Sequence, residues 1–152
     1  MHGVPLEGEY APLDPAGWVR DQIQTWERSG GTEATTLRDT GLPVVIMINR
    51  GARSGKLHKT PLMRVEHDGR YVLVGSKGGA PQHPAWVHNV RTHPDVEVWD
   101  GPVQRDFVAR ELEPDERPDW WERAVAAYPP YAEYQQRTDR VIPLFLLEPA
   151  AS

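Results

Sequence analysis

Apolar and polar positions change their periodicity several times along the chain, and this pattern predicts strands interleaved with short helices. Residues 44–48 form an apolar run without alternation, which is typical of a strand covered on both faces. Residues 57–67 follow as its expected partner strand. Asp68 and Gly69 are a strong hairpin-turn signal, and residues 71–75 are the expected returning strand.

The second half of the chain carries the same kind of signal. Residues 96–99 alternate as a half-buried strand, Asp100 and Gly101 predict a second hairpin turn, and residues 103–112 follow as its second strand. Residues 142–147 are the final apolar strand. About six strands, mostly linked by hairpins, indicate an α+β fold built on a small antiparallel barrel with packed helices.

Helical spacing begins near the N-terminus. Asp14 is expected to cap a helix that has Pro15 at its first position and extends over residues 16–28. The apolar residues at positions i, i+4 and i+7 of this segment are Val19, Ile23 and Trp26. Two interpretations stay open. The stripe packs on the rest of the domain, or the helix serves as a lid or a peripheral membrane contact, because Trp18 adds a second tryptophan.

Further helices are expected later in the chain. Pro84 starts a short helix that ends by residues 93–94. Residues 114–128 have helical spacing, the two prolines at 129–130 interrupt it, and a shorter helix continues to about residue 137. The apolar residues predicted to share a face are Trp86 and Val90 in the first helix, and Trp121, Val125 and Tyr128 in the second.

Composition bounds the organisation of the chain. Its 152 residues suit one domain, which we divide into an arm and amphipathic helix at 1–31 and a barrel at 32–152. No apolar run reaches the ~18 residues of a membrane-spanning helix. A cytoplasmic location is therefore expected, with peripheral contact at the inner face of the plasma membrane as the alternative that the N-terminal helix offers. The oligomeric state stays open.

Several function classes are excluded by composition. The chain has no cysteine, which removes disulfides, thiolate nucleophiles and cysteine-ligated metals. An isoelectric point near 5.7 argues against a nucleic-acid-binding protein. The six histidines show no metal-binding pair such as H-x-x-x-H, so no metal site is expected.

A basic turn stands out in this acidic chain. Residues 44–64 contain five basic residues and no acid, so the rest of the chain, whose total formal charge is −5, sums to −10. The basic residues are Arg50, Arg53, Lys56, Lys59 and Arg64. The sequence GARSGK at 51–56 lacks the glycine spacing of a P-loop and is followed by Leu57 in place of Ser or Thr. Either this is a solvated hairpin tip, or its glycines and cations bind an anion.

Two other motifs carry candidate chemistry. A second glycine-rich basic loop, SKGG at 76–79, lies one hairpin further on and favours the anion-binding interpretation. Tyr128, Tyr131 and Tyr134 recur every three residues across the two prolines. This spacing fits a buried aromatic cluster, and it also fits phenol hydroxyls that project into a pocket and donate hydrogen bonds to a substrate oxygen.

Taken together, these motifs resemble the deazaflavin-dependent nitroreductase family, the flavin/deazaflavin oxidoreductases that use coenzyme F420. The resemblance covers about residues 42–149 with order and spacing kept. The matching pieces are GARSGK at 51–56, TPL at 60–62, DG at 68–69, SKGG at 76–79, HPAW at 83–86, Asn89, YPPYAEY at 128–134 and TDRVIP at 138–143.

The resemblance implies a split β-barrel related to flavin-mononucleotide-binding proteins, and a deazaflavin cofactor with a phosphate and an oligoglutamate tail. The implied cofactor-binding residues are Arg53, Ser54, Lys56, Lys59, Pro61, Ser76, Lys77, Gly78, Gly79, Trp86 and Asn89. The implied catalytic residues on the substrate side are Ser76, Tyr128, Tyr131 and Tyr134. Met63 stands where relatives can carry a tyrosine, and loss of that hydroxyl is expected to change which acceptor is reduced.

The expected activity is therefore hydride transfer from reduced F420 to an electron-poor small molecule: a quinone, an activated enone such as an unsaturated lactone, or a nitroaromatic compound. Two alternatives remain. One is an enzyme that uses flavin mononucleotide on the same barrel, and the other is a non-catalytic F420-binding protein. The basic turn favours F420, because an oligoglutamate tail accounts for several cations better than one phosphate does.

Overall fold

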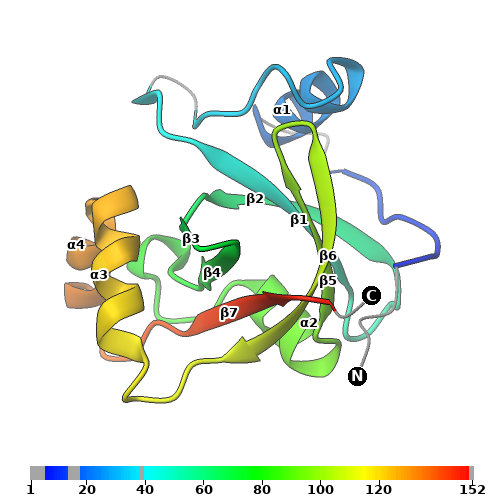
Figure 1. The fold of residues 1–152 in the computed structure, drawn as a ribbon. Coiled ribbons are helices and arrows are strands. Elements are labelled where there is room, and N and C mark those ends of the chain that lie inside the picture. The colour runs from blue at the N-terminus through cyan, green and yellow to red at the C-terminus, as the bar shows by residue number, and fades with distance from the viewer. Residues whose placement is uncertain (1–5, 14–17, 38–39, 151–152) are drawn as a thin grey trace.

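The computed structural model describes residues 6–13, 18–37 and 40–150, and its centre is a curled antiparallel sheet of seven strands (Figure 1). Hydrogen bonding orders them β2-β1-β5-β6-β7-β4-β3. The strands are β1 (Val44–Arg50), β2 (Leu57–Met63), β3 (Glu66–His67), β4 (Arg70–Val74), β5 (Asp95–Asp100), β6 (Val103–Glu111) and β7 (Leu144–Pro149). The helices are α1 (Trp18–Arg28), α2 (Ala85–Thr92), α3 (Arg117–Ala127), α4 (Pro130–Gln136) and the 3₁₀ turn η2 (Lys77–Gly79). This arrangement confirms the predicted α+β split barrel.

The strand β1 is buried on both faces, as its unbroken apolar run predicted. Successive side chains of a strand point to opposite faces. Val45 and Met47 pack with residues of α2, β6 and β7 in one core cluster. Ile46 and Ile48 pack on the other face with Ile23 and Trp26 of α1.

The helix α1 therefore covers the sheet, which confirms the first interpretation of its apolar stripe. Ile23 is 0% exposed and Trp26 is 2% exposed, while Val19 packs at the edge of the same cluster. An ion pair between Glu27 of α1 and Lys59 of β2, at 3.0 Å, also joins the helix to the sheet. The predicted cap at 14–15 lies outside the described residues, and the boundary drawn after residue 31 stays a prediction.

The strand expected at 57–67 is two strands in the structure, so that prediction was wrong in its extent. The strand β2 pairs along its length with β1, whereas β3 pairs with β4 at the other edge of the sheet. Between them Arg64 turns the chain, and its Nε donates to both carboxylate oxygens of Asp100, at 3.0 and 2.9 Å. The turn at 68–69 forms as predicted, with both residues at positive φ.

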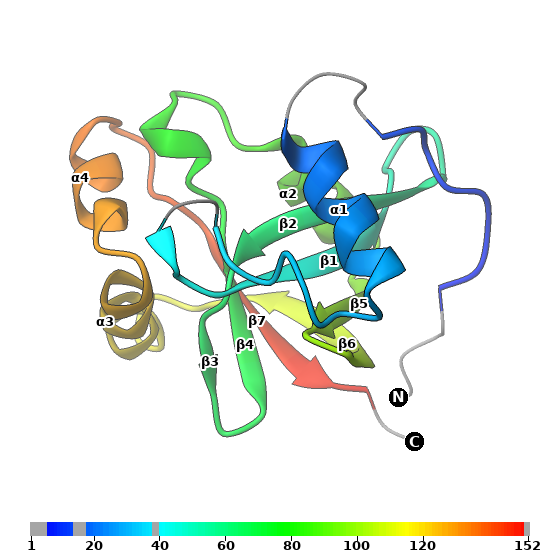
Figure 2. The ribbon, with the colours of Figure 1, turned by 90° about the horizontal axis from the view of Figure 1, so that it is seen from above.

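Helices α3 and α4 pack on the β3–β4–β7 side of the sheet, opposite α1 (Figure 2). The residues predicted to share a face of α3, Trp121, Val125 and Tyr128, are half-buried and pack against the core cluster on this side, while Trp120 and Ala124 are the buried residues of the helix. The two prolines at 129–130 separate this helix from the next. The helix ends at extended Tyr128, and the chain restarts as α4, whose Tyr131 takes the core position at 5% exposure.

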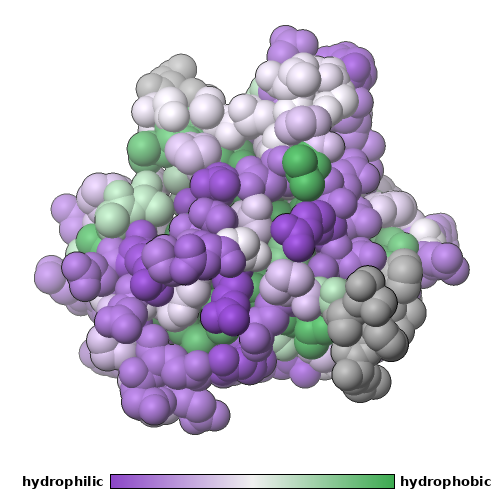
Figure 3. Space-filling model, viewed as in Figure 1, coloured by the Kyte–Doolittle hydropathy of each residue, from purple (hydrophilic) through white to green (hydrophobic). Residues whose placement is uncertain are grey.

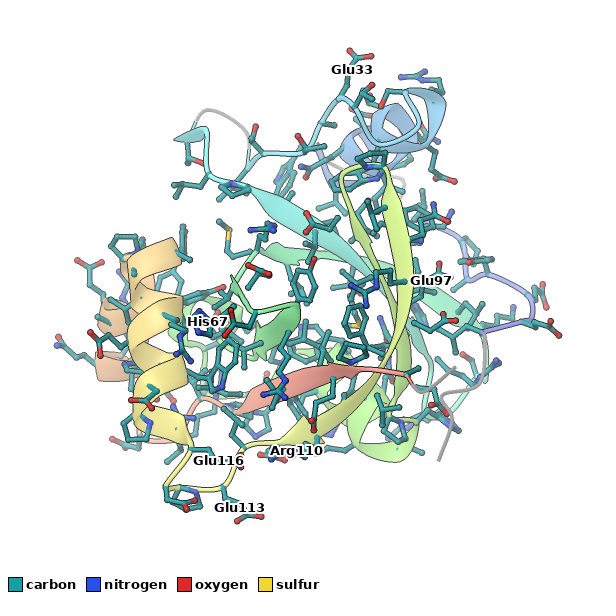
Figure 4. The ribbon with its side chains drawn as sticks, viewed as in Figure 1. Glu33, His67, Glu97, Arg110, Glu113 and Glu116 are labelled. Atoms are coloured by element: carbon teal, nitrogen blue, oxygen red, sulfur yellow. The ribbon has the colours of Figure 1, made fainter. Side chains whose placement is uncertain are left out.

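Charged side chains fix the start of α3. Arg110 of β6 makes two hydrogen bonds to Glu116, at 2.7 and 2.8 Å, and a third to Glu148 of β7. Figure 4 shows Glu116 near the lower end of α3, Arg110 to its right below β7, and His67 beside the helix. The His67 ring meets that of Trp120 edge-on, with centroids 6.2 Å apart.

The visible surface of the face in Figure 3 is mostly hydrophilic, with hydrophobic residues in small separate patches. Within the described residues, no helix is both long and apolar enough to cross a membrane. The elements thus leave one region where α1, β2, η2, α2 and α4 converge, and the candidate site lies there.

Candidate functional site

Two adjoining cavities of about 710 Å³ and about 430 Å³ open beside β2 and α2, and Thr60 and Trp86 line both. The larger, called the turn cavity here, is lined by Asn49, Gly51, Ala52, Arg53, Ser54, His58, Thr60, Ala85, Trp86, His88 and Asn89. The smaller, called the tyrosine cavity, is lined by Trp18, Gln22, Leu37, Val44, Thr60, Pro61, Leu62, Met63, Val74, Ser76, Lys77, Gly78, Pro84, Trp86, Tyr128, Tyr131 and Tyr134. None of these described residues is acidic. One elongated anionic molecule can therefore occupy both cavities.

The turn between β1 and β2 forms one wall of the turn cavity. Its backbone closes through two hydrogen bonds, from Gly51 N to Lys56 O at 2.8 Å and from Gly55 N to Gly51 O at 3.0 Å. A Cβ at position 51 would lie 2.6 Å from the Ser54 Oγ and 2.9 Å from the His58 Nε2. Glycine at this position therefore lets the polar side chains of the turn close over the backbone.

A buried amide network holds this turn against α2. The Asn89 Nδ2 donates to the Asn49 Oδ1 at 2.8 Å, and the Ala52 N–H donates to the Asn89 Oδ1 at 2.9 Å. Asn49 is 0% exposed and also donates to the Thr60 Oγ1 at 3.1 Å. Asn89 was a predicted site residue, whereas Asn49 was missed. The available signal was a carboxamide at the end of an otherwise apolar strand.

The structure places the predicted basic residues in different surroundings. Arg53 lines the turn cavity together with Ser54. Lys56 is half-exposed and lies 3.8 Å from the Glu9 carboxylate. Lys59 pairs with Glu27 and lies over the rings of Tyr10 and Trp99, because neighbouring residues of β2 point to opposite faces. The structure brings neither lysine into the lining of the cavities.

The loop at 76–79 forms a wall of the tyrosine cavity. Lys77, Gly78 and Gly79 all have positive φ, at 46°, 63° and 79°. A Cβ at Gly79 would lie 2.6 Å from the carbonyl oxygen of Tyr134, so this glycine lets the loop pack directly on α4. Ser76 is 8% exposed, and its hydroxyl has no hydrogen-bond partner in the described part of the chain. Gly79 itself is buried behind the cavity wall.

The three tyrosines form the predicted aromatic cluster and also line the same cavity, while their role as hydrogen-bond donors to a substrate stays a prediction. The rings of Tyr128 and Tyr131 meet edge-on with centroids 4.9 Å apart. The hydroxyls of Tyr128 and Tyr134 share a hydrogen bond of 3.1 Å. This bond, together with burial, raises the pKa of Tyr128 to about 12, and burial raises the pKa of Tyr131. Both phenols are protonated at neutral pH, as a tyrosine with its ordinary pKa of 10 already is.

Residues of α1 complete the tyrosine cavity, although neither Trp18 nor Gln22 was among the predicted site residues. Trp18 and Gln22 line it on the side of β1 and β2. The Gln22 amide nitrogen donates to the carbonyl oxygens of Ala34 and Thr36, both at 2.9 Å. These bonds fix α1 to the segment before β1. Met63 lines the cavity as well.

Comparisons with known proteins show which family the sequence resembles. The sequence profile of the family described as F420H(2)-dependent quinone reductase matches residues 18–149. An F420H(2)-dependent quinone reductase of Mycobacterium tuberculosis is 33% identical over 109 residues, which cover 69% of this chain and 72% of the relative.

Solved structures are also similar to this chain. A structure of an F420H2-dependent reductase is 55% identical, with a TM-score of 0.67, over 70% of this chain and 94% of that chain. A structure described as a domain-swapped dimer is 50% identical, with a TM-score of 0.70, over 86% of this chain and 97% of that chain.

Proposed function

The chain belongs to the family of F420H2-dependent quinone reductases, and from this premise we propose that the two adjoining cavities hold F420 and that a quinone is reduced beside the tyrosines. Membership makes the protein an oxidoreductase that uses coenzyme F420. One observation carries the proposed location. A basic, hydroxyl-lined cavity and an aromatic cavity share Thr60 and Trp86 as a common wall.

The residues present fit this cofactor. Arg53 and the Ser54 hydroxyl supply donors for a phosphate or carboxylates in the turn cavity. The backbone at Gly78 has open space where a Cβ would stand, so a flat ring can approach it closely. Trp86, held edge-on against Phe145 with centroids 5.7 Å apart, gives the shared wall a fixed position. The cofactor-binding roles of Arg53, Ser54 and Trp86 are proposals on these grounds.

When bound, the reduced deazaflavin supplies a hydride. Overall the reduced cofactor loses two electrons and two protons, and the quinone gains them to become a hydroquinone. The protein must therefore hold the acceptor close and stabilise the negative charge that develops on its oxygen. The phenols of Tyr128 and Tyr131 suit that task as donors, because both side chains line the cavity and a phenol is protonated at neutral pH. The Ser76 hydroxyl offers a further unpaired donor.

Quinones are the proposed first class of acceptor, followed by activated enones and nitroaromatic compounds. Flat aromatic acceptors fit a cavity lined by Trp18, Trp86 and three tyrosines. Met63 also lines this cavity, and its thioether can donate no hydrogen bond to a quinone or a nitro oxygen, so such a bond must come from the tyrosines or Ser76.

The acceptor order is tested by anaerobic turnover of reduced F420 with menadione, an unsaturated lactone and a nitroaromatic compound, with reduced flavin mononucleotide as the matched control donor. We expect rapid oxidation of reduced F420 by menadione and little activity with the flavin. Activity with the flavin alone would identify a flavin enzyme. Tight F420 binding without turnover of any acceptor would identify a non-catalytic binding protein. Either result would overturn the proposal.

Peripheral membrane contact through α1 stays a second, separate proposal. Trp26 is 2% exposed and unavailable for it, whereas Trp18 is 38% exposed at the start of the helix. Co-sedimentation with anionic vesicles, compared between the wild type and Trp18→Ala, tests this contact. Equal partitioning of both proteins into the supernatant would contradict it.

A further inference from the structure

Arg140 lies between α4 and β7 and makes four hydrogen bonds to groups that carry no negative charge. Its Nε donates to the Ala80 carbonyl at 2.8 Å, and its Nη2 donates to the Ser76 carbonyl at 2.7 Å. Its Nη1 donates to the Gly75 carbonyl at 3.0 Å and to the His83 Nδ1 at 2.9 Å. These three carbonyls bracket the loop that lines the tyrosine cavity. The guanidinium is thus a clamp on both ends of that loop.

The loop needs such a clamp because its own backbone is strained. Lys77 has a φ of 46°, a conformation that a residue with a side chain rarely adopts. Strained residues persist only where the surrounding structure holds them. Within the loop, hydrogen bonds run from Gly79 N to Ser76 O at 2.9 Å and from Ala80 N to Lys77 O at 3.0 Å. Arg140 adds donors to two of the same residues.

The position of Arg140 is itself fixed by α4. The Gln135 Nε2 donates to the Arg140 carbonyl at 2.8 Å, and the Ile142 N–H donates to the Gln135 Oε1 at 3.0 Å. The same helix carries Tyr131 and Tyr134. Arg140 therefore joins the tyrosine helix to the loop and to His83, two residues before the start of α2.

We propose that Arg140 is a positioning residue that fixes the conformation of Ser76, Lys77 and Gly78 in the wall of the cofactor site. In this proposal the neutral ring of His83 accepts a hydrogen bond that fixes the orientation of the Arg140 guanidinium. This inference rests on the proposed function for its effect on F420, but the clamp itself is a property of the free protein. Lysine cannot replace arginine here, because one ammonium nitrogen with three donors cannot reach the four acceptors that three guanidinium nitrogens contact.

Protonation of His83 opposes the clamp. An arginine only donates, so the His83 Nδ1 must accept, and a protonated ring would place two cations together. The groups that face this ring are Arg140, Arg91, His88 and Glu111. Burial first, and then Arg140, Arg91 and His88, lower its pKa from the ordinary 6.5, while Glu111 opposes them. The clamp is therefore intact above about pH 6.5 and weakens as the pH falls through the lowered pKa.

The first experiment measures amide hydrogen exchange of residues 76–80 in the cofactor-free wild type, Arg140→Lys and Arg140→Met. We expect faster exchange in both variants, with the lysine variant between the other two, while exchange in β1 and β5 stays unchanged. Unchanged exchange at 76–80 would overturn the inference whatever the protein binds. Faster exchange in a protein that does not bind F420 would support the clamp and reject only the proposed function.

The second experiment measures F420 affinity and turnover from about pH 5 to pH 8. We expect Arg140→Met to lower affinity about tenfold and turnover by up to about a hundredfold at neutral pH. His83→Asn keeps an acceptor near the Nδ1 position but does not titrate, and His67→Asn on the distant β3 is the matched control. Dividing the affinity of each variant by that of the wild type at the same pH cancels any effect of the cofactor's own titration. We expect His83→Asn, but not His67→Asn, to flatten the acidic loss of affinity seen in the wild type. An identical pH profile in the wild type, His83→Asn and His67→Asn would contradict the role of His83.

Discussion

Replacing either of two neighbouring glycines by alanine gives a sharp test of how the loop packs on α4. Gly78 and Gly79 have similar φ angles, 63° and 79°, so alanine suffers a comparable backbone penalty at both positions. Their surroundings differ. A Cβ at 78 meets nothing within 4 Å, whereas a Cβ at 79 would lie 2.6 Å from the Tyr134 carbonyl oxygen and 3.0 Å from its Cα.

The magnitudes follow from these contacts. A left-handed alanine costs roughly 1–2 kcal/mol, and the reduced freedom of the unfolded chain returns about 0.4–1 kcal/mol, so Gly78→Ala should lower the free energy of unfolding by about 1 kcal/mol. Gly79→Ala adds a clash with backbone atoms that cannot rotate away, which costs a further 1–3 kcal/mol, roughly. At about 2–4 °C per kcal/mol for a domain of this size, its Tm should fall below that of Gly78→Ala by roughly 2–12 °C.

The assay is urea and thermal unfolding of both variants without cofactor, followed by kinetics with reduced F420 and menadione. Relief of the clash by movement of α4 would displace Tyr131 and Tyr134, so kcat should fall further in Gly79→Ala than in Gly78→Ala. Equal losses of stability in the two variants, within about 0.5 kcal/mol, would show that the loop does not contact α4 as described.

Three further predictions concern charge and acid–base chemistry. Arg53→Met should weaken F420 binding by about tenfold or more in titrations, most for long tails and low salt, whereas Lys59→Met should change affinity little; equal losses would contradict the placement of the tail. Tyr131→Phe should leave F420 affinity nearly unchanged and slow turnover, and a parallel loss of both would place Tyr131 against the cofactor. Hydrogen bonds from Arg110 lower the pKa of Glu116 from 4.5 to about 2. The ion pair therefore stabilises the fold fully above pH 4.5, and this stabilisation is lost as the pH falls to about 2. Glu116→Gln should therefore lower the Tm at neutral pH and have little effect near pH 2, and a Tm loss independent of pH would contradict this.

Local sequence signals predicted the elements that depend on near neighbours. The apolar run of β1, the hairpin turns at 68–69 and 100–101, and the proline break before α4 all occur as expected. The division of residues 57–67 could not be foreseen, because it depends on closure of the sheet. Arg64 meets Asp100, a residue 36 positions later, and this contact exists only in the folded barrel.

The candidate site shows the same limit. Glycine, serine and tyrosine motifs indicated the walls of both cavities, and the structure brings most of those residues together. Lys59 belonged to the same cationic cluster in sequence, yet strand alternation and Glu27 on α1 direct it elsewhere. Arg140 was part of a matching motif but was not among the predicted site residues. Its role depends on three carbonyls from a loop 60 or more positions away, which no local pattern reveals.

The central claim is that one F420 molecule spans both cavities, with its tail at the basic turn and its ring beside the tyrosines. A crystal structure of the complex with oxidised F420 measures this most directly. The account predicts density for tail carboxylates or the phosphate within hydrogen-bond distance of Arg53 and Ser54, and the deazaflavin ring between Trp86 and the Ser76–Gly78 backbone, with Tyr131 facing open space for an acceptor. A cofactor bound on any other face, or one with its ring in the turn cavity, would contradict it.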